Sequence, residues 1–222
     1  MAVALIVAAG SGERLGFGRP KALVAVAGQP MLHWSVAALR RVKGVRQIVV
    51  ALPADALDQA PTGTVAVAGG EARSQSVAAA LGAAGDGDPV IVHDAARPLA
   101  TPELFEAALR ELERTGADAV VSASPVTDTI KQVEHTTLRV ERTLERSRLW
   151  AVQTPQVFRR RVLEQHLLAA GPDRLATATD DAWLIEQAGG SVVVLPAPPD
   201  NLKITTPQDL QLVELLLARR KD

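Results

Sequence analysis

The sequence predicts an α/β fold, with a mainly parallel sheet that helices cover on both faces. Short apolar segments of strand length alternate along the chain with longer segments that fit helices. The first apolar segment, residues 2–9, carries no charge, as is typical of a strand buried on both faces. A length of 222 residues and a hydrophobic share of 47% fit one domain with a substantial core. We therefore expect a single domain over residues 1–222.

The strands are predicted, in order, within residues 2–9, 45–53, 63–70, 89–98, 117–125 and 191–196. Three helices between and after them have recognisable ends, at residues 29–42, 101–116 and 205–220. The first helix has Pro30 near its first turn. The second has Thr101 as N-cap, Pro102 at the first helical position and Gly116 as the stop. The third has Thr205 or Thr206 as N-cap, and Thr206 with Asp209 resembles a capping box.

A glycine-rich loop follows the first strand and carries two cations, Arg14 and Lys21. A loop at this end of a strand lies where open α/β sheets bind ligands, and its peptide N–H groups and cations suit a phosphate. The P-loop spacing is absent, because Lys21 follows Pro20 and precedes Ala22, and the dinucleotide GxGxxG spacing is absent as well. The alternative interpretation of the glycines is a tight turn with solvated charges.

Composition excludes several classes of function. The chain has no cysteine, which removes disulfides, thiolate catalysis and cysteine-based zinc sites. No apolar run approaches the length of a membrane span and no signal peptide is evident, so we expect no membrane association and a cytoplasmic location. A net charge of −1 and an aromatic share of 3% argue against a nucleic-acid partner.

One segment, about residues 127–150, breaks the alternation of strands and helices. Eight of residues 131–148 are Lys, Arg or Glu, which is too charged for a core strand. Leu138 and Val140 alternate with charged residues, as in a half-exposed strand. We expect a projecting β-hairpin arm, and because an isolated hairpin is marginal in water, we expect it to pack on a second subunit. A helix–loop excursion is the alternative.

Polar groups recur at the ends of the predicted strands. Each has an ordinary explanation alone: Asp94 could cap a loop, Arg97 could pair with it, Thr179 could be an N-cap, and Lys203 could be solvated. Together, they would gather along one edge of a single sheet, which favours a binding site there.

The glycine-rich and polar segments together resemble those of a known family. The segments AAGSGERLGFGRPK, GGEARSQSV, HDAARP, DTIK, ERSRLWAVQTPQVF, ATDD and DNLKIT resemble, in order, the 2-C-methyl-D-erythritol 4-phosphate cytidylyltransferase family. The resemblance implies a Rossmann-like nucleotidyltransferase fold, a homodimer joined through the arm, dependence on Mg²⁺, and transfer of a cytidylyl group from CTP to methylerythritol phosphate with release of pyrophosphate. One departure is that Ala22 stands where the family usually has Gln, so a hydrogen bond from that Gln is lost or replaced.

The resemblance also implies roles for particular residues. Those that act on the reacting phosphates would be Arg14, Lys21 and Lys203, and those that bind CTP would be Ala8, Ala9, Gly10, Gly12, Gly70 and Ser76. Those that bind methylerythritol phosphate would be Asp94, Arg97, Thr129, Arg146, Thr154 and Thr179, with Lys203. Asp94 is the only protein candidate for a metal ligand, and Thr129 and Arg146 would reach the site of the partner subunit from the arm.

Three other interpretations stay open at this point. A ribitol 5-phosphate cytidylyltransferase would have the same nucleotide half, although ERSRLW before QTPQ suits methylerythritol phosphate better. An NAD(P)-dependent dehydrogenase is opposed by the glycine spacing. A non-catalytic nucleotide-binding module is opposed by the three cations Arg14, Lys21 and Lys203.

Overall fold

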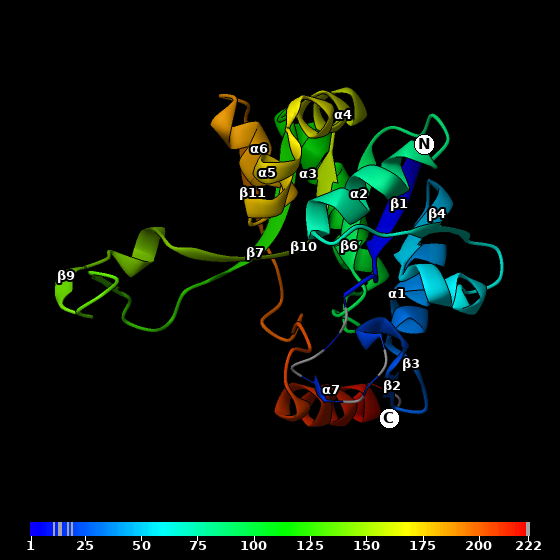
Figure 1. Cartoon of the computed structure of the whole chain (residues 1–222), viewed down its shortest axis with the longest axis horizontal. Coiled ribbons are helices and arrows are strands. Elements are labelled where there is room, and N and C mark those ends of the chain that lie inside the picture. The colour runs from blue at the N-terminus through cyan, green and yellow to red at the C-terminus, as the bar shows by residue number, and fades with distance from the viewer. Residues whose placement is uncertain (11, 13–14, 17, 19, 221–222) are drawn as a thin grey trace.

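The computed structural model describes residues 1–10, 12, 15–16, 18 and 20–220. Within them a seven-stranded sheet forms the centre of the molecule, with strands in the order β11-β7-β10-β6-β1-β4-β5 (Figure 1). The strands of this sheet are β1 (Ala2–Val7), β4 (Val45–Leu52), β5 (Val65–Ala68), β6 (Val90–Asp94), β7 (Ala119–Pro125), β10 (Trp150–Phe158) and β11 (Val192–Pro196). The α-helices are α1 (Met31–Arg40), α2 (Arg73–Gly82), α3 (Pro102–Thr115), α4 (Arg160–Ala169), α5 (Pro172–Thr177), α6 (Asp181–Gln187) and α7 (Pro207–Arg219).

The sheet is mainly parallel, as predicted. Strand β1 pairs in parallel with β4 and β6, β4 with β5, and β7 with β11. Strand β10 is the exception, because it lies antiparallel between β6 and β7. The six predicted strands are confirmed, whereas β10 was expected only as the close of the arm. The polar residues of β10 and Pro155 interrupt the apolar pattern by which a strand is recognised, although residues 153–158 are buried.

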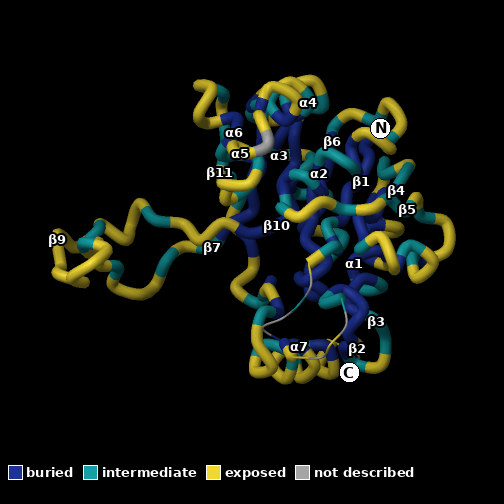
Figure 2. The backbone as a smooth tube through the Cα atoms, viewed as in Figure 1, coloured by how far each residue is buried: buried dark blue, intermediate teal, exposed yellow. Residues whose placement is uncertain are grey.

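Helices cover both faces of the sheet, which confirms the predicted layers. Along β1, Ala4 and Ile6 pack with α1 and α3 on one face, and Val3 and Leu5 pack with α2, α4 and α6 on the other. All four side chains are at most 1% exposed. Figure 2 shows the buried strands at the centre and the exposed residues outside them. This alternation fixes the register, since a slip by one residue would exchange the two faces.

Helix ends follow the local sequence signals. Helix α3 begins after Thr101 with Pro102 at its first position and stops at Gly116, whose φ of 68° lies in the left-handed region that glycine tolerates. Helix α7 begins with the predicted capping box, in which Thr206 Oγ1 accepts from the Asp209 N–H and Asp209 accepts from the Thr206 N–H. No helix in the described part of the chain has the length and apolar character of a membrane span.

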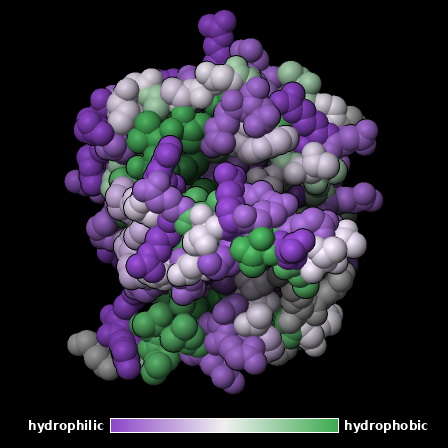
Figure 3. Space-filling model, turned by 90° about the vertical axis from the view of Figure 1, so that its left-hand side faces the viewer, coloured by the Kyte–Doolittle hydropathy of each residue, from purple (hydrophilic) through white to green (hydrophobic). Residues whose placement is uncertain are grey.

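The segment between β7 and β10 leaves the body of the molecule as a long excursion (Figure 1). It contains a two-stranded antiparallel sheet of β8 (Lys131–Val133) and β9 (Val140–Thr143), followed by the 3-10 turn η4 (Arg146–Arg148). Figure 3 views the molecule from the side to which this excursion projects and shows apolar side chains among hydrophilic ones. The exposed apolar side chains of the excursion and its root are Val133, Leu138, Val140, Trp150 and Val152.

Candidate functional site

Two pockets open where the strands β1 and β6 end, and they meet at three shared residues. The first has a volume of about 500 Å³ and is lined by the glycine loop, the ends of β1 and β6, and the start of α2. The second has a volume of about 290 Å³ and is lined by β10 and α6. Arg73, Asp94 and Lys203 line both. This is the edge of the sheet at which open α/β folds bind ligands.

The two ends of the glycine loop meet, and Lys21 lines the first pocket. The Lys21 N–H donates to the Gly10 carbonyl at 3.2 Å and closes the loop. Gly12 has a φ of 74°, and a Cβ there would lie 2.8 Å from the Lys21 Cβ. A side chain at position 12 would therefore push Lys21 out of place, which explains the glycine.

The opposite wall of the first pocket is equally close-packed. A Cβ on Gly69 would lie 2.4 Å from the Ala9 Cβ and 2.8 Å from the Ser76 Oγ. Ser76 is 2% exposed, and its Oγ accepts from the Gly70 N–H at 3.1 Å. Small residues at these positions bring two stretches of backbone together, so main-chain groups line this end of the pocket.

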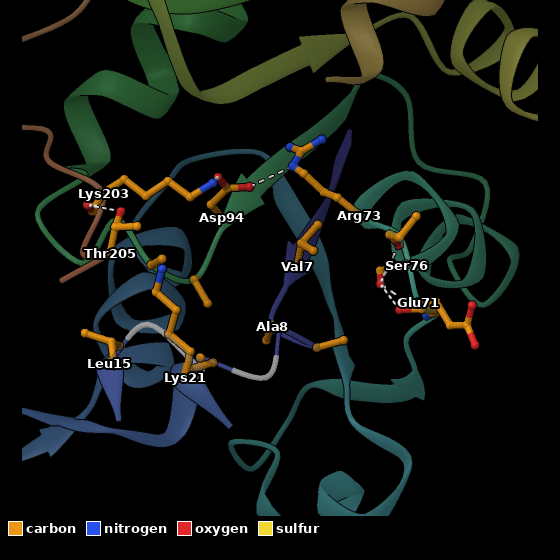
Figure 4. Close-up of a pocket in the computed structure, with 18 residues that line it drawn as sticks. Val7, Ala8, Leu15, Lys21, Glu71, Arg73, Ser76, Asp94, Lys203 and Thr205 are labelled. Carbon is orange, nitrogen blue, oxygen red and sulfur yellow. Dashed lines mark hydrogen bonds and ion pairs between the residues drawn. The ribbon is translucent and has the colours of Figure 1, made fainter. Parts of the chain in front are cut away.

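At the junction of the two pockets, one carboxylate binds two cations (Figure 4). Asp94 Oδ1 accepts from Arg73 Nε at 3.0 Å, and Asp94 Oδ2 accepts from Lys203 Nζ at 2.7 Å. Arg73 Nη1 donates to Asp181 Oδ2, so Arg73 bridges two carboxylates. These four side chains come from the end of β6, the start of α2, the segment after β11 and the start of α6.

The charges of this cluster stabilise one another. Burial opposes the charge of Asp94, but Arg73 and Lys203 outweigh it and hold the pKa of Asp94 far below its ordinary value. Burial likewise opposes the charge of Arg73, but the two carboxylates outweigh it and raise the pKa of Arg73. Burial is the larger effect on Asp181, whose pKa is raised. The site therefore presents Arg73 and Asp94 in their charged forms at neutral pH.

The second pocket is lined mainly by polar side chains, which come from the start of α2, the end of β6 with the turn after it, β10, the start of α6 and the segment after β11. Thr154 lies on β10, where its Oγ1 accepts from the Asp94 N–H at 3.0 Å and contacts His93 Nδ1 at 3.1 Å. Arg97 lies in the turn after β6 and is 8% exposed. His93 itself is fully buried and packs edge-on against Phe105, with ring centroids 4.9 Å apart. It lines neither pocket.

Most of the predicted site residues gather in these pockets. The first pocket contains Ala8, Ala9, Gly10, Gly12, Lys21, Gly70, Ser76, Asp94 and Lys203, and the second contains Asp94, Arg97, Thr154, Thr179 and Lys203. Arg14 lies outside the described residues. Thr129 and Arg146 are exposed on the arm and line neither pocket of their own chain, where Arg146 Nη1 donates to the Thr127 carbonyl at 2.7 Å.

One expectation is corrected. Thr179 is not the N-cap of helix α6, because Asp180 holds that position and accepts from the Trp183 N–H at 2.9 Å. Thr179 precedes the cap, and the Asp180 carboxylate satisfies one of the N–H groups at this helix start. Two other residues were given no role in the predicted site: Arg73, which was expected only among the polar groups at the sheet edge, and Asp181. They stand 108 residues apart, and only the fold brings them together.

The chain matches a family model described as 2-C-methyl-D-erythritol 4-phosphate cytidylyltransferase over residues 2–219. A protein of that name from Saccharopolyspora erythraea is 46% identical over 227 residues, covering 97% of this chain and 99% of the relative. One from Rubrobacter xylanophilus is 39% identical over 228 residues, covering 99% of this chain and 96% of the relative.

Solved structures agree with the sequence comparisons. The crystal structure of 2-C-methyl-D-erythritol 4-phosphate cytidylyltransferase from Thermus thermophilus matches with a TM-score of 0.81 and 34% identity, covering 98% of this chain and 100% of that chain. The crystal structure of 4-diphosphocytidyl-2C-methyl-D-erythritol synthase from Anaerococcus prevotii matches with a TM-score of 0.83 and 28% identity, covering 99% of both chains. The Rossmann-like nucleotidyltransferase fold expected from the sequence is thereby confirmed.

Proposed function

Since the chain belongs to the 2-C-methyl-D-erythritol 4-phosphate cytidylyltransferase family, its reaction is cytidylyl transfer from CTP, and we propose that the two joined pockets divide this reaction between them. The first pocket takes CTP and the second takes methylerythritol phosphate. The observation that carries this division is the shared junction, because Arg73, Asp94 and Lys203 line both pockets. A phosphate of the second substrate placed there would face the α-phosphate of the first.

The reaction needs positioning more than proton transfer. The phosphate of methylerythritol phosphate is already an anion, because the second pKa of a phosphate monoester is about 6. It attacks the α-phosphorus of CTP in line, a P–O bond forms, and the bond to pyrophosphate breaks. No general base is required. The cations must instead hold two polyanions together and stabilise the crowded phosphorus. We assign this work to Lys21 and Arg14 on the nucleotide side and to Lys203 on the attacking side.

Base selection belongs to the close-packed wall of the first pocket. Backbone groups near Ala8, Ala9 and Gly70, with Ser76, would contact the edge of the cytosine. The small residues that bring these segments together leave little room for a purine. Cytosine presents an amino donor where uracil presents an oxygen acceptor, so a site built for that donor leaves buried groups unpaired when UTP binds.

We propose Mg²⁺ as the metal and CTP as its main ligand. The described residues contain no group of three His, Cys, Asp or Glu side chains arranged to hold a metal ion. Both carboxylate oxygens of Asp94 are already engaged, by Arg73 and by Lys203, so Asp94 could bind a metal only if one of these pairs opened. A divalent ion on the triphosphate would neutralise charge that the protein's cations leave uncompensated.

We also propose a homodimer joined through the arm. The arm exposes Leu138 at 70% and Val140 at 55%, and a lone hairpin with such residues gains little stability in water. A second copy that covers this surface would bring Thr129 and Arg146 toward the second pocket of its neighbour. The cytoplasmic location expected from the sequence stays a prediction.

Incubation with nucleotides and sugar phosphates tests the proposed function. The protein is given CTP, UTP or ATP, each with methylerythritol phosphate or ribitol 5-phosphate, and pyrophosphate release is measured with and without Mg²⁺. We expect rapid release only with CTP, methylerythritol phosphate and Mg²⁺ together. Equal release with UTP would contradict the cytidine assignment, and a preference for ribitol 5-phosphate would move the enzyme to that related activity.

A further inference from the structure

Asn201 is a buried residue that lies behind the second pocket and connects three of the segments that line it. It is 2% exposed and lines neither pocket. It is also the only asparagine among the 222 residues, so its amide group is not a common surface feature of this chain. It lies between β11 and α7, two residues before Lys203.

The side chain of Asn201 binds two adjacent residues of β10. Its Nδ2 donates to Gln153 Oε1 at 2.8 Å and to the Thr154 carbonyl at 2.9 Å. Both N–H groups of the amide are thereby used. These acceptors lie at an irregularity in β10, where the pairing with β7 shifts between Val152 and Gln156. Bulges of this kind re-aim side chains next to functional sites.

The backbone of Asn201 binds another segment, the turn after β6. Its carbonyl accepts from Arg97 Nη1 at 2.7 Å. Arg97 is 8% exposed, and burial lowers its pKa, an effect that the neighbouring Asp94 opposes in part. The second pocket draws polar residues from β10, from the turn after β6 and from the segment after β11. Asn201 touches the first two segments and belongs to the third.

We propose that Asn201 is a positioning residue for the second substrate, which sets Arg97, Thr154 and Lys203 relative to one another. The inference rests on the proposed function, because it takes the second pocket as the site of methylerythritol phosphate. Asn201 itself contacts no substrate. It acts through the three residues that do, and two of them, Arg97 and Thr154, line the second pocket alone. The loss of its amide therefore weakens binding of the sugar phosphate more than binding of the nucleotide.

The test compares two substitutions with a matched control. Asn201→Ala removes the amide, and Asn201→Asp keeps the size but turns a carboxylate toward two acceptor oxygens. Gln47→Ala is the control, since Gln47 Oε1 also joins distant segments, by accepting from the Gly85 N–H at 2.7 Å, and lies in neither pocket. The measurements are kcat and both KM values in pyrophosphate release, with thermal unfolding of each variant.

We expect both Asn201 variants to raise the KM for methylerythritol phosphate about tenfold or more and to change the KM for CTP less than about threefold, with a lower kcat, because a misplacement near 1 Å can cost about 10²-fold. The control variant should keep all three constants. If Asn201→Ala does not fold, Asn201→Ser, which keeps a short donor, replaces it in the comparison.

Two outcomes would overturn the inference. In one, a folded Asn201 variant keeps the wild-type ratio of the two KM values. In the other, both KM values rise equally and Gln47→Ala, at the same loss of thermal stability, shows the same rise, so that the role is merely structural. Failure of the proposed function is separate, because it appears in the wild-type enzyme, which would then release no pyrophosphate from CTP and methylerythritol phosphate.

Discussion

Asp94 and Lys203 stand 109 residues apart in sequence and meet at 2.7 Å, carboxylate oxygen to ammonium nitrogen. Because Asp94 also binds Arg73, the pair fixes two cations at the junction of the pockets. We predict that Asp94→Asn lowers kcat/KM at least about tenfold, since both cations lose a charged partner. Steady-state kinetics with both substrates tests this, with Asp86→Asn, an exposed carboxylate in neither pocket, as the control. An Asp94→Asn enzyme with wild-type kcat/KM would contradict it.

Lys21 provides the second prediction. Lys21→Ala should lower kcat by about 10²–10³-fold while the protein stays folded, because the loss of one preorganised charge at a transition state has this typical cost. Lys21 lines the first pocket and contributes little to the core. The exposed Lys43→Ala is the control. Circular dichroism and thermal unfolding establish the fold, and near-normal turnover in a folded Lys21→Ala enzyme would remove this residue from the mechanism.

The third prediction concerns the arm. If each active site is shared, Arg146→Ala should raise the KM for methylerythritol phosphate more than the KM for CTP, since Arg146 would meet the substrate phosphate of the neighbouring subunit. Lys21→Ala and Arg146→Ala subunits are then mixed under conditions that allow exchange, at a methylerythritol phosphate concentration at which each variant alone is nearly inactive. In a heterodimer, one site collects both lesions and the other collects neither, so activity should return.

Each variant mixed with itself, under the same exchange conditions, is the control for this experiment and should stay inactive. Formation of heterodimers is followed by differently tagged subunits. Heterodimers that form and remain inactive would mean that the arm serves the site of its own subunit.

The fourth prediction is a dependence of stability on pH. Burial lowers the pKa of His93 from 6.5 to about 4. Since the unfolded chain binds this proton more readily, the contribution of His93 to stability is complete above about pH 6.5 and is lost as the pH falls through about 4. The difference corresponds to about 3 kcal/mol in the free energy of unfolding.

The check is urea unfolding between pH 4 and 7. His93→Gln, which cannot titrate, should show a shallower fall in the free energy of unfolding over this range, whereas His135→Gln on the exposed arm should keep the wild-type slope. Identical slopes in all three proteins would show that His93 does not titrate differently on folding.

The sequence predicts much of the fold because its strands and helix ends carry local signals. The parallel strands are short apolar segments, and the capping residues Thr101 and Thr206 mark their helices. Strand β10 escaped prediction because Gln153, Pro155 and Gln156 break the apolar pattern. The two glutamines are buried in the fold because their amide groups find partners far along the chain, which a local pattern does not contain.

The site was predicted in part for the same physical reason. Lys21, Asp94 and Lys203 stand at the ends of recognisable strands or loops, so their gathering at one sheet edge could be expected. The bridge from Arg73 to Asp181 could not, because it joins the first residues of two helices that no local signal pairs. The one sequence signal for Asn201 is that it is the sole asparagine. Its partners could not be predicted, because they lie on β10, which was not recognised as a strand.

The antiparallel position of β10 has a consequence for the order in which the protein is made. Strands β6 and β7 follow one another in the chain but are not neighbours in the sheet, because β10 fills the space between them. Until residue 158 has been synthesised, the nascent chain carries one partial sheet, β5-β4-β1-β6, and the single strand β7, and the edges that β10 will join are unpaired. The arm lies between β7 and β10 in the chain and so delays the pairing of β10 with β6 and β7. A chain released from a ribosome that stalls within the arm would leave these edges unpaired, which favours aggregation.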